Sequence, residues 1–239
     1  MIPQKERRVF YEIPFRREKA VKNRFAALAC MTVEPIRGAI CAHPFVVELV
    51  DGTLPGGKFA YALQQDRLRL VTFGRALALV GAKMYSHNDV ALGLYLAEQG
   101  LLAEQELYEY YFKEFQITPD NIKSPSCFGY SSHMLERAAL GSPAEAMAAL
   151  LPCFWLFREL GEHVRKLADS DNPYFKWAER YSGEVYSIVV DKACALTDHL
   201  AAEAGDEERQ GMLNIFLASC RYEYGLKEDA YTLKTWPVM

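Results

Sequence analysis

The chain has 239 residues, of which 51% are hydrophobic and 24% are charged, an ordinary composition for a soluble globular protein. Its formal net charge is −4, whereas proteins that bind nucleic acid non-specifically carry a basic excess, so DNA and RNA are not expected partners. The longest apolar run, near residues 146–157, is too short to span a bilayer, and we expect no membrane segment.

The N-terminal third divides into a charged start, a turn and a long helix. Residues 1–22 lack an apolar core of signal-peptide length and are expected to form an extension to one helical domain over residues 23–239. A turn is predicted at residues 51–57, where three glycines and a proline cluster. Between Lys58 and Tyr85, apolar residues recur at alternating spacings of four and three, which predicts one helix with a single apolar face.

The rest of the chain keeps helical periodicity between breaks. Gly100 is expected to end a helix, and residues 118–131, with two prolines, a glycine and several small polar residues, are predicted to be an irregular loop. Ser142-Pro143 followed by Glu145 is typical of a helix start, and residues 170–173 break the pattern again. Helices are predicted over residues 90–99, 102–115, 142–167, 182–204 and 207–226.

Strand signals are sparse, since no alternating run is flanked by a hairpin turn. No repeat or low-complexity linker divides the chain. We therefore predict an all-α fold built as a multi-helix bundle.

Two carboxylates occupy helix positions where the periodicity predicts a buried apolar side chain. Asp66 lies in the middle of the apolar stripe of residues 58–85, and Glu223 lies on the stripe that includes Phe216 and Leu226. A buried carboxylate is costly unless it is paired or hydrogen-bonded. For Asp66, a structural ion pair, for example with Arg69, and a functional role are equally consistent with the pattern. For Glu223, the alternative is that the apolar face is assigned one position away from its true place and that Glu223 lies on the exposed face of the helix.

Cys153 is one of six cysteines, none of which forms a Cys-X-X-Cys pair, so reduced thiols in a cytoplasm are the simplest interpretation. It follows Pro152 in an apolar segment. A buried cysteine is more often a small hydrophobic residue than a nucleophile, but a proline inside a helix tends to kink it, and a kink beside a thiol would open a cavity.

No metal or cofactor signature accompanies these residues. The five histidines lie far apart without the spacing of metal ligands, and phosphate-binding glycine loops are absent, so no metal and no cofactor are expected. Two acids, a thiol and several tyrosines are sufficient for covalent acid–base chemistry. From the residues alone, the prediction is a helical bundle with a polar pocket.

Several segments resemble the TenA family. They are His-Pro-Phe at 43–45, Asp-Gly-Thr-Leu-Pro at 51–55, Gln-Asp at 65–66, Arg-Ala at 75–76, Tyr-Ser-Ser-His-Met at 130–134, Ala-Ala-Leu-Leu-Pro-Cys-Phe-Trp at 148–155, Trp177, Tyr181 and Tyr-Glu-Tyr at 222–224. The similarity covers roughly residues 25 to 236. The segments at 51–55 and 148–155 are specific to the family, because they occur in this order and at this spacing.

The resemblance implies a haem-oxygenase-like helical fold without haem. It also implies a cytoplasmic homotetramer without a cofactor, whose small-molecule partner is thiamin or an aminopyrimidine. The implied activity is that of a thiaminase II, which hydrolyses thiamin or its aminomethyl-pyrimidine breakdown product to hydroxymethylpyrimidine in thiamin salvage. The family has one branch with a cysteine at this position and one branch without it, and Cys153 resembles the cysteine of the first branch.

The resemblance also implies a role for each matching residue. Cys153 would attack the pyrimidine ring next to its nitrogen, and Glu223 would protonate that nitrogen. Asp66 would hold the aminopyrimidine edge and help to activate the thiol. Tyr130 and Tyr181 would donate hydrogen bonds that position the nucleophile. This chemistry requires a thiol made thiolate by its neighbours and an acid whose pKa is raised by burial.

Five residues depart from the family pattern. Arg69 stands where an aromatic residue usually stacks on the pyrimidine, although a guanidinium can also stack on a flat ring. Phe157 replaces a tyrosine, Leu226-Lys227 replaces a Phe-Trp pair, and Tyr108 stands where histidine is common. Arg69 and Lys227 suggest a pocket for an anionic pyrimidine, phosphorylated or carboxylated. The alternative is that both cations point away and pair with nearby carboxylates.

Three classes of function remain open from the sequence. The first is the hydrolase, favoured because the cysteine, both acids and both tyrosines are present. The second is a TenA-like pyrimidine-binding or regulatory protein with altered substrate preference or no hydrolase activity. The third is a metal-dependent oxidase of the same fold, which would need clustered histidines and glutamates.

Overall fold

The computed structural model describes residues 24–102 and 105–237. Within these ranges the chain forms eleven α-helices and no strand, which confirms the all-α prediction. The predicted extension of residues 1–22 lies outside the described residues. No helix in these ranges is both long enough and apolar enough to cross a membrane.

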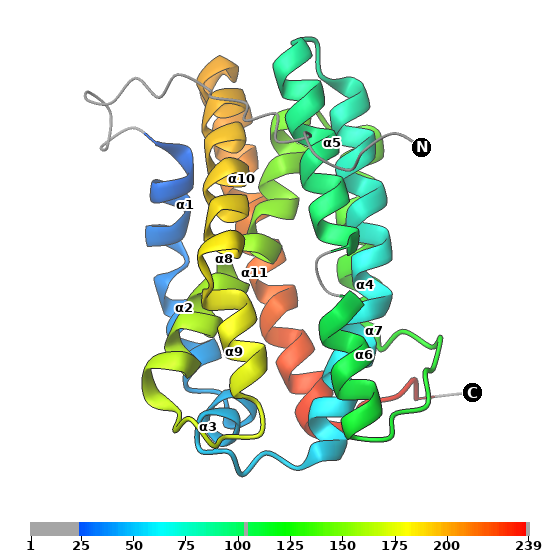
Figure 1. Cartoon of the computed structure of the whole chain (residues 1–239). Coiled ribbons are helices and arrows are strands. Elements are labelled where there is room, and N and C mark those ends of the chain that lie inside the picture. The colour runs from blue at the N-terminus through cyan, green and yellow to red at the C-terminus, as the bar shows by residue number, and fades with distance from the viewer. Residues whose placement is uncertain (1–23, 103–104, 238–239) are drawn as a thin grey trace, which may run out of the picture.

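Six long helices lie side by side along the length of the molecule, and five shorter ones flank them or close one end (Figure 1). The long helices are α4 (Gly56–Lys83), α5 (His87–Leu102), α7 (Pro125–Leu140), α8 (Pro143–Leu167), α10 (Glu184–Glu203) and α11 (Asp206–Thr232). The short ones are α1 (Phe25–Thr32), α2 (Glu34–Cys41), α3 (Pro44–Val50), α6 (Gln105–Glu114) and α9 (Phe175–Ser182).

Helix α8 is the centre of the bundle and packs against α4, α7, α9, α10 and α11. Its residues 146–157 are all buried, as expected for a helix that is apolar on every side. A capping box starts it, because Ser142 Oγ accepts a hydrogen bond from the Glu145 amide at 3.1 Å and Glu145 Oε2 accepts one from the Ser142 amide at 3.1 Å. The predicted start and end of this helix are confirmed.

Two breaks were predicted in the wrong place. Helix α5 continues through Gly100, because that glycine allows close packing: a Cβ there would lie 3.1 Å from the Phe73 ring. The predicted loop at residues 118–131 ends early, because Ser124 caps α7 by accepting a hydrogen bond from the Cys127 amide and Pro125 is its first residue. The Ser-Pro pair marks a helix start here.

Other elements were missed or cut short. Helices α1, α2 and α3 were not predicted, nor was α7, and α9 lies between the break predicted at residues 170–173 and the helix predicted from residue 182. Helices α1, α2, α3 and α9 have seven or eight residues, too few for a clear periodicity. Helix α11 extends to Thr232 rather than ending near residue 226. The predicted helix at residues 58–85 is confirmed as α4.

Candidate active site

One turn of α4 carries polar side chains into the bundle. The stripe that includes Leu63, Leu70 and Phe73 is buried against neighbouring helices, and the same face carries Asp66 and Arg69 inward. The Asp66 side chain is 11% exposed and that of Arg69 is 1% exposed. The sequence-predicted ion pair between them is present. The charges on this stripe therefore lie in the interior.

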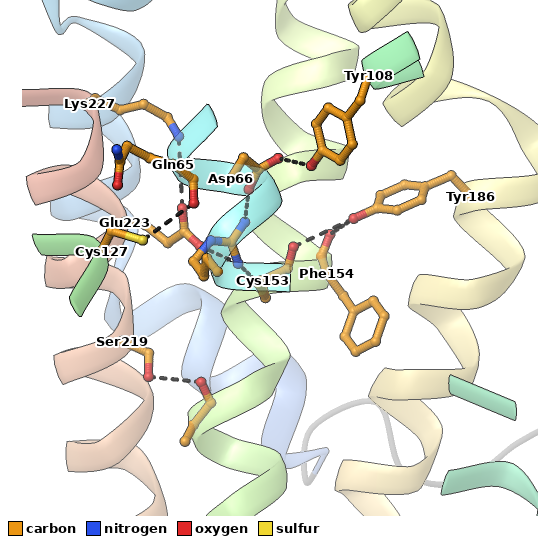
Figure 2. Close-up of polar contacts among 12 residues, drawn as sticks. Gln65, Asp66, Tyr108, Cys127, Cys153, Phe154, Tyr186, Ser219, Glu223 and Lys227 are labelled. Carbon is orange, nitrogen blue, oxygen red and sulfur yellow. Dashed lines mark hydrogen bonds and ion pairs between the residues drawn. The ribbon is translucent and has the colours of Figure 1, made fainter. Parts of the chain in front are cut away.

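Helix α8 presents Cys153 from the opposite side, buried to 4% exposure. The helix continues through Pro152. Tyr186 of α10 donates its hydroxyl to the carbonyl oxygens of Phe154, at 3.2 Å, and of Cys153, at 3.5 Å. These bonds hold the backbone beside the thiol from the side of α10 (Figure 2).

Helix α11 contributes Glu223, whose side chain is 1% exposed. This confirms that Glu223 occupies a core position rather than a misjudged surface. Lys227, one turn further along, brings its Nζ to 3.8 Å from Glu223 Oε2. Among the described residues, neither carboxylate oxygen of Glu223 has a hydrogen-bonding partner. The carboxyl group is therefore available to a ligand.

Arg69 joins the three helices. Its Nη2 donates to Asp66 Oδ1 and its Nη1 donates to Cys153 Sγ, while Nη1 also lies 3.8 Å from Glu223 Oε1 (Figure 2). The three predicted catalytic residues thus meet around one guanidinium. Asp66 uses its other oxygen, Oδ2, to accept a hydrogen bond from the Tyr108 hydroxyl at 3.0 Å.

Burial shifts the ionisation of the cluster. It raises the pKa of the Glu223 carboxyl, although Arg69 and Lys227 oppose the shift. It also raises the pKa of the Cys153 thiol, and the nearby Arg69 offsets this only in part. Burial opposes the charge on Arg69, but Cys153, Asp66 and Glu223 raise the pKa of the guanidinium well above its ordinary value. The expected acid with a raised pKa is present, whereas the pKa of the Cys153 thiol is raised and not lowered as the implied chemistry requires.

The predicted aromatic residues surround the same cluster. Tyr130 and Tyr181 are fully buried, on α7 and α9. Within the described chain, the Tyr130 hydroxyl has no hydrogen-bonding partner, and its ring stacks on Tyr222 with centres 5.6 Å apart. The Tyr181 ring lies 4.9 Å from the ring of Phe157. Arg69 Cζ lies 5.2 Å from the Phe157 ring centre.

Two cavities flank the cluster. The first holds about 620 Å³ of space not filled by atoms, and its walls are mostly apolar residues with Asp66 and Lys227 as polar members. The second holds about 450 Å³ and is lined by Arg69 and Cys153, among others. Phe157 lines both cavities. Openings with room for only a few water molecules therefore reach the cluster from two sides.

The alternative that Arg69 and Lys227 point away from the pocket and pair with nearby carboxylates is wrong in part. Arg69 and Lys227 do pair with nearby carboxylates, but they do not point away from the site. Both are buried in it, because Asp66 and Glu223 lie on the inward faces of the same helices, one turn away from each cation.

The sequence left two contributors without a role. Tyr108 was noted only as a departure from the family pattern, yet it is hydrogen-bonded to Asp66. Tyr186 was not noted, and its contact with the backbone beside Cys153 depends on how α10 packs on α8. In the described ranges, no group of three or more His, Cys, Asp or Glu side chains is arranged to hold a metal ion.

The fold and the site together define a class of helical proteins with a heme oxygenase-like fold and an internal thiol–carboxylate cluster. A domain of unknown function with a heme oxygenase-like fold from Shewanella denitrificans OS217 superimposes with a TM-score of 0.64 at 12% identity, covering 85% of this chain and 90% of that chain. At this identity the similarity concerns the fold alone, and it confirms the predicted architecture.

The sequence identifies the family within that class. Residues 31–226 match the TENA/THI-4/PQQC family model, and the chain belongs to this family. An aminopyrimidine aminohydrolase of Bacillus subtilis (strain 168) is 34% identical over 204 residues, covering 81% of this chain and 84% of the relative. The structure of a TenA homologue from P. horikoshii OT3 is 29% identical, with a TM-score of 0.78, and the match covers 87% of this chain and 98% of that chain.

Proposed function

We propose that this protein is an aminopyrimidine hydrolase of the thiaminase II type and that Cys153 is its nucleophile. The observation that carries the proposal is the meeting of Cys153, Asp66 and Glu223 around one buried point, beside two cavities. The similarity to aminopyrimidine aminohydrolases supports the substrate class. The substrates would be thiamin or its aminomethyl-pyrimidine degradation product.

The proposed reaction begins with a new bond from Cys153 Sγ to the ring carbon beside the ring nitrogen. Glu223 gives its proton to that nitrogen, and burial supports this assignment because it raises the pKa of the carboxyl and so favours the protonated form. The thiol proton has to leave as the bond forms, and Asp66 is proposed as the base that takes it. Asp66 would also bind the amino edge of the ring.

The adduct then expels the leaving group from the exocyclic methylene. The carbon–nitrogen bond breaks and its electron pair leaves with the nitrogen. The amine of aminomethyl-pyrimidine also takes the proton that Asp66 received from the thiol, whereas the thiazole of thiamin leaves without a proton. Water adds to the methylene carbon and loses a proton to Asp66, or to solvent when Asp66 is still protonated. The carbon–sulfur bond breaks, the sulfur takes back its proton from Asp66, the ring nitrogen returns its proton to Glu223, and hydroxymethylpyrimidine is released. In this scheme the hydroxyls of Tyr130 and Tyr181 position the sulfur and the ring.

Turnover of aminomethyl-pyrimidine and thiamin tests the proposal. We expect hydroxymethylpyrimidine release by the wild type and a loss of at least about 10³-fold in kcat for Cys153→Ser, since an alcohol is a far weaker nucleophile at neutral pH. Cys220→Ala, at a buried cysteine of α11 outside both cavities, is the control and should retain activity. Equal turnover by Cys153→Ser and the wild type would exclude the covalent route, and no turnover by the folded wild type would contradict the hydrolase assignment.

The assembly and the location remain predictions. The resemblance implies a homotetramer in the cytoplasm. Sedimentation equilibrium of the purified protein tests the assembly: four times the chain mass of 27.1 kDa is expected, and a monomer would contradict the prediction.

A further inference from the structure

The guanidinium of Arg69 fills the centre of the candidate active site. Its Nη2 donates to Asp66, its Nη1 donates to Cys153, and Glu223 lies 3.8 Å from Nη1. The side chain is 1% exposed. Asp66, Cys153 and Glu223, which bind or react with the ring in the proposed reaction, already contact Arg69 or lie beside it.

Aromatic rings face the same guanidinium. Its Cζ lies 5.7 Å from the centre of the Tyr130 ring and 5.2 Å from the centre of the Phe157 ring. Carboxylates and a sulfur at the edges, with aromatic rings nearby, form a cage suited to a flat, delocalised cation. We call the five residues Asp66, Tyr130, Cys153, Phe157 and Glu223 the acid–aromatic cage.

An aminopyrimidine protonated on its ring nitrogen has the same chemical pattern as a guanidinium. It is flat, its charge is delocalised over an N–C–N unit, and it presents N–H donors along one edge to a carboxylate. We propose that Arg69 is an internal occupant of the position that the aminopyrimidine takes, and that it is the residue that sets substrate specificity. This proposal rests on the proposed function, which supplies the position of the ring.

The cavities on both sides of Arg69 are narrow, so its side chain fills most of the space at the centre of the cage. The cavity of about 450 Å³ is lined by Arg69 itself, and the cavity of about 620 Å³ reaches Asp66 and Lys227 from the other side. Among the described residues, Arg69 Nε has no hydrogen-bonding partner, so the cage satisfies only part of the guanidinium. Movement of the side chain out of the cage would open its centre to a ring.

Displacement of the Arg69 side chain determines which rings the site can bind. When Arg69 leaves, Asp66 and Glu223 lose a cation in a buried site, and a buried carboxylate without a partner is strongly unfavourable. A ligand compensates only if it presents N–H donors and cationic character to the same carboxylates. The wild type should therefore select rings with an amino group next to a ring nitrogen and reject pyrimidines that lack this amidine-like edge.

Calorimetric titration of hydroxymethylpyrimidine into the wild type and Arg69→Ala tests the proposal. Because the ring no longer competes with the side chain, we expect the Kd to fall at least about tenfold in the variant, with a parallel fall in KM. Arg221→Ala, an exposed arginine on α11, is the matched control and should bind as the wild type does. An unchanged or weaker affinity in folded Arg69→Ala overturns the proposal.

A second measurement does not depend on turnover. Guanidinium chloride at millimolar concentration should raise the Tm of Arg69→Ala above its value in equal sodium chloride, because free guanidinium refills the cage, and it should compete with hydroxymethylpyrimidine. The wild type should show no such rise, since its cage is already occupied. Absence of both effects in Arg69→Ala contradicts the proposal. If Arg69→Ala does not fold, Arg69→Gln takes its place in both experiments.

The two proposals fail in different ways. If no variant and no wild-type protein hydrolyses an aminopyrimidine, the hydrolase assignment fails, and guanidinium binding by Arg69→Ala still decides whether the cage holds a planar cation. If the wild type hydrolyses its substrate but Arg69→Ala binds hydroxymethylpyrimidine no better, the hydrolase assignment stands and the role of Arg69 is wrong.

Discussion

At the scale of single residues, four charged side chains share one buried cluster, and their mutual pairing offsets the cost of removing them from water. Arg69 pairs with Asp66, and Lys227 lies 3.8 Å from Glu223. Removing one partner leaves the other charge buried and unpaired, which typically costs about 3–5 kcal/mol. The stability of the site therefore depends on a cation at the position of Arg69.

Glu223→Gln should change how stability depends on pH. The pKa of Glu223 is raised in the folded protein above its ordinary value of 4.5, so the folded state holds this proton more tightly than the unfolded state. The stabilisation is complete below the ordinary value and is lost as the pH rises through the folded value. We expect the Tm of the wild type to fall relative to that of Glu223→Gln as the pH increases from about 4.5 upward.

The difference between the two Tm values isolates this residue from other titrating groups. Glu207→Gln, which removes an exposed carboxylate from the first turn of the same helix, serves as the control. A wild-type minus Glu223→Gln difference that stays constant across the whole pH range would show that burial does not perturb this carboxyl.

The sequence could identify this cluster but not its geometry. A charge in an apolar stripe marked Asp66 and Glu223, and the family resemblance added Cys153. Periodicity describes one helix at a time, so it does not reveal that Arg69 reaches across from α4 to α8. For the same reason the hydroxyl of Tyr108 and the backbone contact of Tyr186 were not predicted.

At the scale of elements, the distance between α8 and α9 positions Tyr181. Gly161 of α8 lies directly against that residue: a Cβ on Gly161 would lie 2.6 Å from Tyr181 Cβ and 2.9 Å from its carbonyl carbon. Only glycine permits this approach, because the backbone of α9 would otherwise have to move. The position of one proposed site residue therefore depends on a glycine outside the cluster.

Gly161→Ala should displace α9 and weaken the protein. Overpacking of this kind typically costs about 1–3 kcal/mol, and the shift of Tyr181 should also lower kcat. Gly38→Ala is the matched control, since among the described residues no heavy atom outside its own helix lies within 4 Å of the added Cβ, and alanine is favoured over glycine in a helix by roughly 0.5–1 kcal/mol. Denaturant unfolding of both variants measures the effect; equal or greater stability of Gly161→Ala would contradict the close approach.

Element prediction succeeded for the longest helices, missed α7 because its first residues were predicted to be a loop, and failed for most of the short helices. The long helices α4 and α8 carry many turns of one pattern, and both were predicted nearly to their ends. The seven- and eight-residue helices α1, α2, α3 and α9 owe their formation to packing at the sides and at one end of the bundle. Proline and glycine also act in two ways: Pro125 starts a helix, and Gly100 allows two helices to approach.

At the scale of the whole molecule, α4, α7, α8 and α11 place the acid–aromatic cage inside the bundle between two cavities. The six long helices form a frame that keeps bulk water from the thiol and the carboxylates (Figure 1). In such a setting an electrostatic contact with a bound ring is stronger than it is in water. The bundle is therefore suited to chemistry on a ring that it encloses.

The most direct test of the central claim, that this cluster is the active site, is a crystal structure of Cys153→Ser with bound hydroxymethylpyrimidine. We expect the ring between α4, α8 and α11, with its amino edge on Asp66, its ring nitrogen within hydrogen-bonding distance of Glu223, and its reacting carbon facing position 153. A ring bound elsewhere, for example in the surface groove beside Phe112 and Pro119, with Asp66 and Glu223 untouched, would contradict the claim.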